Sequence, residues 1–269
     1  MPVTAGTPVT AIAIAEPDRV VIRGRDLCED FIGRVSFTDY FLFLLTGEKP
    51  DPKLVKLVDA AIVSIAEHGL VPSVQAARMT LAAAPDSLQG AVAAGLLGCG
   101  SVILGASEAA GRLLGRVIEV AGADGDLDAA AVEIVGELRA VRQPIPGFGH
   151  DLHKPHDPRA IRLLDYAQDL GTAGRHVAAL AAVRCAIPKV YGRELVLNIS
   201  GATPAVLLDA GFPAGALKGI ALVGRTASLV SHLLEEAARP IGFKLSGAAA
   251  AAAAYDGAYP NNIGGEPRS

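Results

Sequence analysis

Apolar side chains recur at helical spacing along this chain, and most of them are small. In the segment 53–68, KLVKLVDAAIVSIAEH, they fall at positions i, i+3 and i+4, the pattern of a helix with one buried face. Hydrophobic residues make up 51% of the 269 residues, whereas aromatic residues make up 4% and tryptophan is absent. Small aliphatic side chains favour the close packing of helices. We therefore expect an all-α fold.

Capping residues and turns divide the chain into further helices. Ser36 is a candidate N-cap, and Gly47 ends the apolar segment that follows it. The opening stretches TAIAIA and RVVIRG favour short strands, and residues 188–192 are expected to form a turn. The alanine run 248–254 favours a helix. Other helices are expected at 73–84, 87–99, 106–122, 128–141, 158–169, 173–186 and 215–237.

Charge and cysteine usage exclude several classes of protein. The formal net charge of −4 argues against a nucleic-acid or anionic-membrane partner, because both need a concentrated positive surface. Cys28, Cys99 and Cys185 are far apart and form no CxxC motif, which favours buried thiols in a reducing compartment. No signal peptide is expected, and the apolar run 91–106 is too short to span a bilayer, so it is expected to be a core helix. We expect a cytoplasmic protein.

The stretch PGFGHDLHKPHDPRA, residues 146–160, contains His150, His153 and His156. Their spacing drifts around a helix, and no cysteine or second histidine cluster completes a tetrahedral set, so no metal is expected. A solvated polar loop is one interpretation. A catalytic or substrate-binding role for at least one histidine is the other, because Gly147 and Gly149 allow a ligand to approach the backbone and imidazole titrates near neutrality.

Two further candidates lie in helical segments. Glu67 and His68 precede a glycine, which is typical of a helix C-cap but also places an imidazole at a helix end. Arg225 lies in the apolar stretch ALVGRTASLV, where a buried guanidinium needs an anionic partner, either a structural carboxylate or a bound one. Taken alone, Arg239 is an exposed cation at a helix end. No GxSxG, Walker or GxGxxG motif supports a serine hydrolase, a P-loop enzyme or a dinucleotide-binding domain.

Taken together, stretches across nearly the whole chain resemble the citrate synthase family. The resemblance is greater to its short branch, which includes citryl-CoA lyases and the citrate-synthase-like module of ATP-citrate lyase. It depends on the order and spacing of four motifs. These are GFGH, DPR, the Asn-x-x-Gly turn, and GRT followed first by a histidine and then by Arg-Pro. The stretches that carry it are VVIRGRDLCEDFIGRVSFTDYFLFLLTGEKP, AEHGLVPSVQAARMTLA, AAGLLGCGSVILGASEAA, PIPGFGHDLHKPHDPRA, LVLNISGATPAVLLDAGFP and LVGRTASLVSHLLEEAARPI.

The resemblance implies a two-domain helical fold and a homodimer or higher homo-oligomer. A large domain would comprise residues 1–105 and 212–269, and a small domain of residues 106–211 would close over a cleft. The ligands would be an acyl-CoA thioester, as substrate, and a di- or tricarboxylate, with no permanently bound cofactor. By the same resemblance, His68 and His150 would contact the keto or hydroxy group and the carboxylates of the ligand, and Arg159 and Arg225 would bind its carboxylates. Arg239 would reach across into the site of the second subunit. The backbone that receives coenzyme A would be Pro146, Gly147, Phe148 and Gly149.

The sequence departs from the family pattern at two catalytic positions. The enolate-stabilising histidine is missing, since the matching stretch is residues 103–106, ILGA. The catalytic aspartate is replaced by Ser200 in the turn NISG. An unassisted hydroxyl is not a base near pH 7, so this replacement removes a contribution of roughly 100- to 10,000-fold. Another carboxylate could take over proton transfer, with Glu67, Asp151 and Asp157 as candidates.

The resemblance implies a carbon–carbon lyase that cleaves citryl-CoA, or a related 3-hydroxyacyl-CoA, to acetyl-CoA and oxaloacetate. Such chemistry needs a polarised carbonyl, a stabilised enolate and a proton shuttle, and histidine and arginine supply most of these. One alternative is citrate synthase-type condensation of acetyl-CoA with a 2-oxo acid. Another is a noncatalytic acyl-CoA-binding or regulatory module, because Ser200 replaces the catalytic base.

Overall fold

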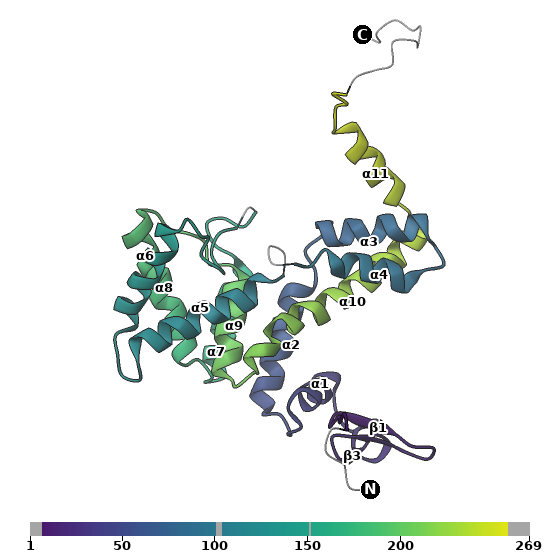
Figure 1. The fold of residues 1–269 in the computed structure, drawn as a ribbon, viewed down its shortest axis with the longest axis horizontal. Coiled ribbons are helices and arrows are strands. Elements are labelled where there is room, and N and C mark those ends of the chain that lie inside the picture. The colour runs from purple at the N-terminus through teal and green to yellow at the C-terminus, as the bar shows by residue number, and fades with distance from the viewer. Residues whose placement is uncertain (1–6, 101–103, 151, 258–269) are drawn as a thin grey trace, which may run out of the picture. The chain divides into compact units, whose positions relative to one another are not determined.

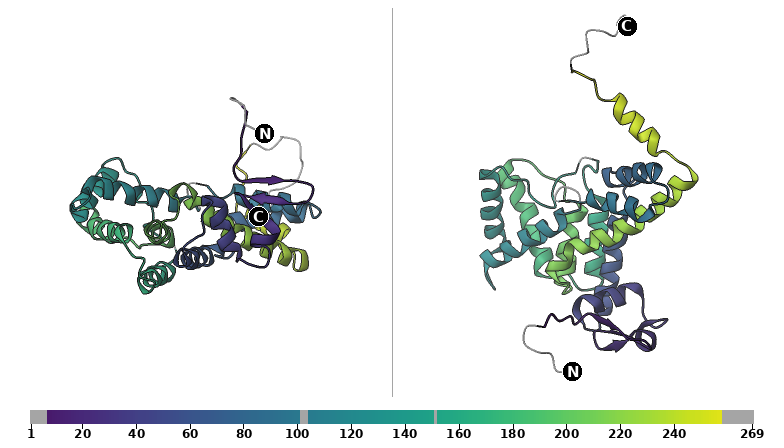
Figure 2. Two further views of the ribbon diagram at one scale, coloured as in Figure 1. Left: turned by 90° about the horizontal axis from the view of Figure 1, so that it is seen from below. Right: turned by 45° about the vertical axis from the view of Figure 1, so that its right-hand side comes forward.

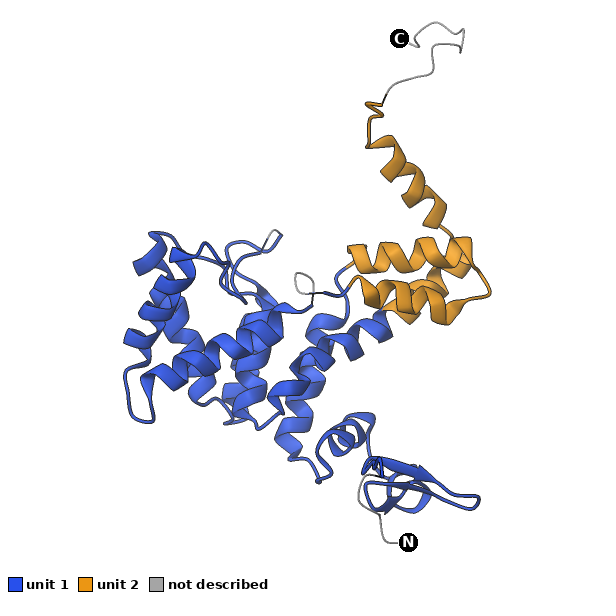
Figure 3. Cartoon of the chain, in the orientation of Figure 1, with its two compact units in different colours: residues 1–68, 99–228 blue, residues 69–98, 229–269 orange. Residues whose placement is uncertain are grey.

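The computed structural model describes residues 7–100, 104–150 and 152–257, which divide into two compact units. The first unit combines residues 1–68 and 99–228, and the second combines residues 69–98 and 229–269 (Figure 3). Helices dominate both units, which confirms the predicted all-α class. This division follows internal packing, and the predicted small domain at 106–211 stays a prediction.

The first unit begins with a small antiparallel sheet in the predicted strand-like region. Strands β1 (Ala13–Ala15), β2 (Val20–Ile22) and β3 (Arg25–Asp26) pair in the order β1-β2-β3, and the π-helical turn η1 (Leu27–Phe31) follows them. Helix α1 (Phe37–Thr46) then begins at Ser36 as predicted. The Ser36 hydroxyl accepts the Asp39 N–H at 3.1 Å, and the Asp39 carboxylate accepts the Ser36 N–H, which is a capping box.

Two large apolar cores build most of the rest of the first unit, and α9 contributes buried residues to both. Helices α2 (Pro52–Ala66), α7 (Pro158–Asp169) and α9 (Ile199–Asp209) share one core, which includes Leu57, Leu163 and Leu207. Helices α5 (Ala106–Ala121), α6 (Leu127–Ala140) and α8 (Arg175–Tyr191) form the other, to which α9 contributes Ala205. In Figures 1 and 2, α9 lies beside α5 and α8. Helix α9 is therefore anchored on two sides.

The second unit is a small helical cluster. It contains α3 (Pro72–Ala83), α4 (Leu88–Leu97), α11 (Gly242–Ala251) and the second half of α10 (Leu217–Ala238), whose first half follows the short 3-10 helix η2 (Ala214–Ala216) in the first unit. Arg78 of α3 is buried and pairs with Glu236 of α10, with Nε 2.7 Å from Oε2. The other Glu236 oxygen accepts the Gly242 N–H at 2.7 Å and so caps α11.

The structure corrects three expectations. Helix α8 continues through Pro188 and ends at Gly192 (φ 71°), because the burial of Ile187 and its neighbours outweighs the hydrogen bond that proline removes near a helix end. The run 91–106 is not one helix, since α4 ends at Leu97 and α5 begins at Ala106. Of the free cysteines, Cys99 is buried, whereas those at 28 and 185 are exposed. No helix in the described ranges is long and apolar enough to cross a membrane.

Candidate functional site

The loop at residues 146–149 is held against the start of α9 by backbone pairing. The Gly149 N–H donates to the Val196 carbonyl at 2.7 Å, and the Asn198 N–H donates to the Gly147 carbonyl at 3.0 Å. Asn198 adds a side-chain bond, because its Nδ2 donates to the Gly149 carbonyl at 2.7 Å. The same side chain caps α9 through its oxygen, which accepts the Ser200 N–H at 3.0 Å. The loop and the predicted Ser200 turn therefore form one rigid corner.

Two glycines permit this close backbone approach. Gly147 has φ +84°, and a Cβ there would lie 2.5 Å from the Gly201 Cα. A Cβ on Gly201 would in turn lie 2.8 Å from the Gly147 carbonyl oxygen. The sequence predicted that Gly147 makes room for a ligand. The structure shows that it makes room for another backbone segment, and the approach of a ligand stays a prediction.

Three histidines meet beside this corner. His68 follows α2, and its Nε2 lies 3.3 Å from the Nε2 of His153. The rings of His150 and His153 have centroids 4.4 Å apart, and those of His68 and His150 are 5.8 Å apart. His156 is exposed. The resemblance predicted that His68 and His150 share a site. The structure adds His153, whose place beside them the sequence did not predict.

Backbone hydrogen bonds fix the tautomer of His150. Its Nδ1 accepts the N–H groups of Leu152 at 3.1 Å and His153 at 3.0 Å, so the neutral ring carries its proton on Nε2. That Nε2 lies 3.3 Å from Nη2 of Arg159. Two donors cannot bond to each other. Among the described contacts, Nε2 of His150 has no acceptor and Nη2 of Arg159 has only Asp157 Oδ2, so one external oxygen can accept from both. This pairing is suited to a carboxylate, a carbonyl or an alkoxide.

Asp157 holds Arg159 in this position. It is fully buried, caps α7 through the Arg159 N–H, and accepts the Arg159 guanidinium with both oxygens. Burial by itself would raise the pKa of Asp157, but hydrogen bonds and charge from Arg159, and a bond from the Ile199 N–H, hold that pKa below its usual value. Asp157 is therefore ionised and paired, so it positions Arg159 and is a poor proton acceptor.

Both His68 and His150 favour the neutral form. Burial lowers the pKa of His68, and the positive charges of Arg159, His153 and Arg225 lower it further. Burial also lowers the pKa of His150, and the nearby Arg159 guanidinium lowers it further. The negative charge of Asp157 opposes both shifts only in part. The site therefore presents neutral imidazoles beside a fixed guanidinium.

Arg225 is buried in α10 and linked to Glu67. Only 2% of it is exposed. Its Nη1 lies 3.5 Å from the Ser228 hydroxyl, which donates to the Glu67 carboxylate. Burial lowers the pKa of Arg225, and the charge of Glu67 opposes this shift. The described contacts agree with a structural partner for Arg225, and its role as a carboxylate ligand stays a prediction.

The remaining predicted residues lie as follows. Ser200 occupies the first turn of α9, and within the described ranges no base is hydrogen-bonded to its hydroxyl. Arg239 belongs to the second unit, where its exposed guanidinium pairs with Glu235. Asp151 and Ile103 lie outside the described residues. Neither the predicted role of Arg239 in a second subunit nor that of Ser200 is decided by these contacts.

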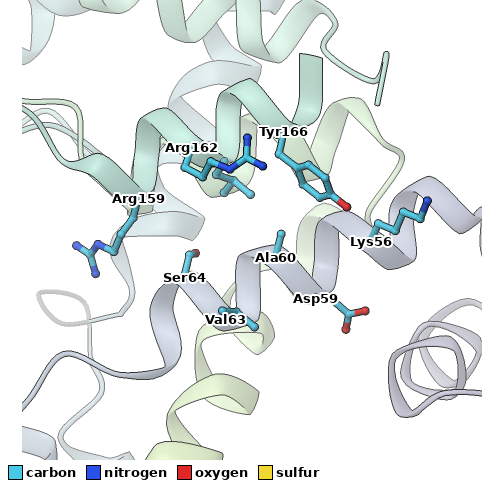
Figure 4. Close-up of a pocket in the computed structure, with 9 residues that line it drawn as sticks. Lys56, Asp59, Ala60, Val63, Ser64, Arg159, Arg162 and Tyr166 are labelled. Carbon is cyan, nitrogen blue, oxygen red and sulfur yellow. The ribbon is translucent and has the colours of Figure 1, made fainter. Parts of the chain in front are cut away.

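A separate cavity of about 450 Å³ lies along α2 and α7. Arg159 borders it, but Figure 4 shows its guanidinium pointing away from the cavity, as its bonds to Asp157 require. The cavity therefore meets the stem of this side chain, and the donors that face His150 belong to a different surface of it. The lining residues are Lys56, Asp59, Ala60, Val63, Ser64, Arg159, Arg162, Leu163 and Tyr166.

The histidine cluster also has the size of a metal site. One ring nitrogen from each of His68, His150 and His153 lies within 4.8 Å of the other two. Metal ligation requires a free lone pair, however, and the Nδ1 of His150 is already bonded to two N–H groups, so its Nε2 carries the proton and faces Arg159. The cluster is therefore better suited to hydrogen bonding than to holding a cation.

Comparison with known proteins agrees with this architecture. The family model for the citrate synthase C-terminal domain matches residues 9–242. The structure of citryl-CoA lyase from Hydrogenobacter thermophilus is 33% identical, with a TM-score of 0.83, and the match covers 95% of this chain and 96% of that one. ATP citrate lyase from Methanothrix soehngenii, solved with citrate and coenzyme A, shares the fold at 22% identity, with a TM-score of 0.79 over 98% of this chain and 44% of that one.

A Mycobacterium tuberculosis relative named for citrate synthase is 31% identical over 228 residues, which is 82% of this chain. The match covers 55% of that relative, so the chain spans about half the length of the curated relatives it matches. The helical architecture, the extent of the family match and the near full-length similarity to citryl-CoA lyase all agree with the predicted resemblance. The chain belongs to the citrate synthase family.

Proposed function

We propose that this protein is a carbon–carbon lyase that cleaves citryl-CoA, or a related 3-hydroxyacyl-CoA, to acetyl-CoA and oxaloacetate. Structural similarity supports the cleaving branch. The Hydrogenobacter citryl-CoA lyase is 33% identical, with a TM-score of 0.83, whereas citrate synthase from Pyrobaculum aerophilum is 25% identical, with a TM-score of 0.62. We further propose that it works as a homodimer, with Arg239 completing the site of the partner.

The observation that carries this proposal is the pair of donors at His150 Nε2 and Arg159 Nη2, 3.3 Å apart. Cleavage of a 3-hydroxyacyl thioester converts a hydroxyl group through an alkoxide into a carbonyl. Two fixed donors at that oxygen stabilise the developing negative charge, and each such donor contributes roughly 3 kcal/mol. Arg159 also binds the neighbouring carboxylate in this proposal, and Arg225 binds a second one.

We propose that the coenzyme A thioester lies against the loop Pro146 to Gly149. The Gly147 carbonyl and both backbone groups of Gly149 are already bonded to the segment before α9. Among the described contacts, the loop groups left for the thioester are the Gly147 N–H and the carbonyls of Pro146 and Phe148. Recognition of coenzyme A by this loop would be achieved mainly through shape, this one donor and these two acceptors.

A direct assay tests the proposal. Purified protein is incubated with citryl-CoA, and acetyl-CoA and oxaloacetate are quantified by mass spectrometry. We expect equal amounts of both products, and a loss of at least 100-fold in the Arg159→Gln variant. Arg162→Gln is the matched control, because Arg162 lies on the same helix with an exposed side chain. Absence of acetyl-CoA above the blank with the native protein would contradict the proposal.

Two other functions have specific support. The names of the curated relatives favour condensation, which predicts free thiol release from acetyl-CoA and oxaloacetate faster than the blank. Ser200 favours a noncatalytic module, because the missing base affects synthesis and cleavage equally. That function predicts saturable coenzyme A binding by calorimetry and no product from any hydroxyacyl-CoA.

A further inference from the structure

Cleavage of a 3-hydroxyacyl-CoA needs a group that takes the hydroxyl proton and returns one to the acetyl carbon. Ser200 is unsuited to this, and Asp157 is buried against Arg159. One oxygen of Glu67 accepts the Ser228 hydroxyl, and the other accepts the backbone N–H of His68 at 2.9 Å. The described carboxylates near the histidines are therefore engaged within the protein. The remaining groups with a suitable chemistry are the imidazoles.

His68 and His153 form a pair with the properties of a proton carrier. Their Nε2 atoms are 3.3 Å apart, and their rings meet edge to face. Two neutral imidazoles bond in this way only if one donates and the other accepts. One Nδ1 of the pair then carries a proton and the other has a free lone pair. Transfer of the shared proton, together with proton gain and loss at the two Nδ1 atoms, exchanges these roles.

The surroundings of His68 favour its neutral form before the pair takes up a proton. His150 packs against His153, and Arg159 and Arg225 add positive charge, whereas Asp157 and Glu67 supply the opposing negative charge. Burial and the cations lower the pKa of His68, as described above. His150 cannot take over this role in its observed arrangement, because its Nδ1 is occupied and its Nε2 already carries a proton.

We propose that His153 and His68 form a proton-transferring pair that replaces the carboxylate missing at position 200. The inference depends on the proposed lyase function. The hydroxyl proton moves to the free ring nitrogen of the pair, and the O–H electrons form the new C=O bond of oxaloacetate. The C–C bond breaks, and its electrons remain on the coenzyme A fragment as a thioester enolate. The protonated pair then gives a proton to the enolate carbon, which becomes the methyl group of acetyl-CoA.

This series of reaction steps is balanced without a further reactant. The products are together isomeric with the substrate, and the pair ends neutral, as it began. His150 and Arg159 stabilise the oxygen throughout and transfer no proton. His153 acts through His68 or directly on the substrate, so the test must separate proton transfer from a structural role.

The test compares His153→Ala, His153→Gln and His156→Ala in the citryl-CoA cleavage assay. His156 lies in the same loop and is exposed, so its removal is the matched control. We expect kcat to fall about 100-fold or more in both His153 variants, with KM changed less than about threefold, and no change in the control. We also expect the acid limb of the kcat profile to move in the His153 variants, and added imidazole to restore part of the His153→Ala activity.

The outcomes separate this inference from the proposed function. A native protein without cleavage activity overturns both. An active native protein whose His153→Ala variant keeps half of its kcat, or whose pH profile is unchanged, overturns the pair alone. Activity that is lost with EDTA and restored by zinc, in a protein that carries one zinc bound through His153, overturns the pair in favour of a metal site. Thermal melting of each variant confirms that the compared proteins are folded.

Discussion

Both carboxylate oxygens of Asp157 accept hydrogen bonds from Arg159. Nε of Arg159 donates to Oδ1 at 3.0 Å, and Nη2 donates to Oδ2 at 2.9 Å. The same Oδ2 also accepts the Ile199 N–H at 3.0 Å. One buried side chain thus joins the start of α7, the start of α9 and the guanidinium that faces His150. The direction of the guanidinium is therefore set by the fold before any ligand binds, which reduces the ordering that a carboxylate ligand must impose.

Asp157→Asn is expected to weaken both folding and ligand binding. The amide cannot accept two charge-assisted bonds from Arg159 while also accepting the Ile199 N–H. Removing one partner of a buried ion pair costs on the order of 3 kcal/mol, and less here because Arg159 is partly exposed. We expect a lower midpoint in urea unfolding and an increased KM for citryl-CoA.

The matched control for Asp157 is Asp165→Asn. Asp165 lies on the same helix and is exposed. It should change neither the unfolding midpoint nor KM beyond the experimental error. Equal stability of the Asp157→Asn and Asp165→Asn variants would show that the Asp157–Arg159 pair does not hold the corner together.

His150→Asn separates the two nitrogens of this histidine. The Asn side-chain oxygen can accept the N–H groups of Leu152 and His153 in place of Nδ1, whereas the Nε2 donor is lost. We expect the melting temperature to fall little and kcat for citryl-CoA to fall about 100- to 1,000-fold, as for other lost oxyanion donors. His150→Ala should lose both. A His150→Asn variant with native kcat would exclude Nε2 from the reaction.

Gly147→Ala is expected to disrupt the corner by a clash and not only by backbone strain. The added Cβ would lie 2.5 Å from the Gly201 Cα, and both partners are backbone atoms that cannot rotate away. Gly149→Ala is the control, since Gly149 also has positive φ, at +97°, but has no atom within 4 Å of the added Cβ. We expect Gly149→Ala to cost about 1 to 2 kcal/mol and Gly147→Ala clearly more in urea unfolding. Equal costs would contradict the clash.

The sequence predicted most helices because their causes are local. Ser36 and Asp39 form a capping box within four residues, and the apolar face of 53–68 corresponds to the buried Leu57 and Val58 of α2. The resemblance also placed His68 and His150 in one site, because a family pattern contains three-dimensional information. The apolar run 91–106 was interpreted wrongly as one helix, because composition does not fix where glycines end a helix.

What the sequence could not predict depends on contacts between distant segments. His153 joins His68 across 85 positions, and no local pattern separates it from the exposed His156. Asp157 was a candidate proton acceptor until the structure placed it against Arg159 and the Ile199 N–H. The sequence predicted a helix at 158–169, which is α7. It did not reveal that the Asp157 carboxylate, which caps this helix, is also bonded to the start of α9.

The pH dependence follows from the direction of the histidine shifts. Burial lowers the pKa of His68 and His150 in the folded protein, while the unfolded chain keeps values near about 6.5. Near and below pH 6.5 the unfolded state therefore binds more protons, so the free energy of unfolding falls as the pH falls and levels off only about one pH unit above that value. Asp157 does not change this trend, because its lowered pKa keeps it ionised in this pH range.

We expect kcat/KM to retain its neutral-pH value until well below pH 6.5. We also expect the urea midpoint to fall less on acidification in His150→Asn than in the native protein. His156→Asn should follow the native curve, since that side chain is exposed. An acid limb of kcat/KM at or above pH 6.5 would mean that the catalytic histidines are not the neutral, partly buried groups that the structure describes.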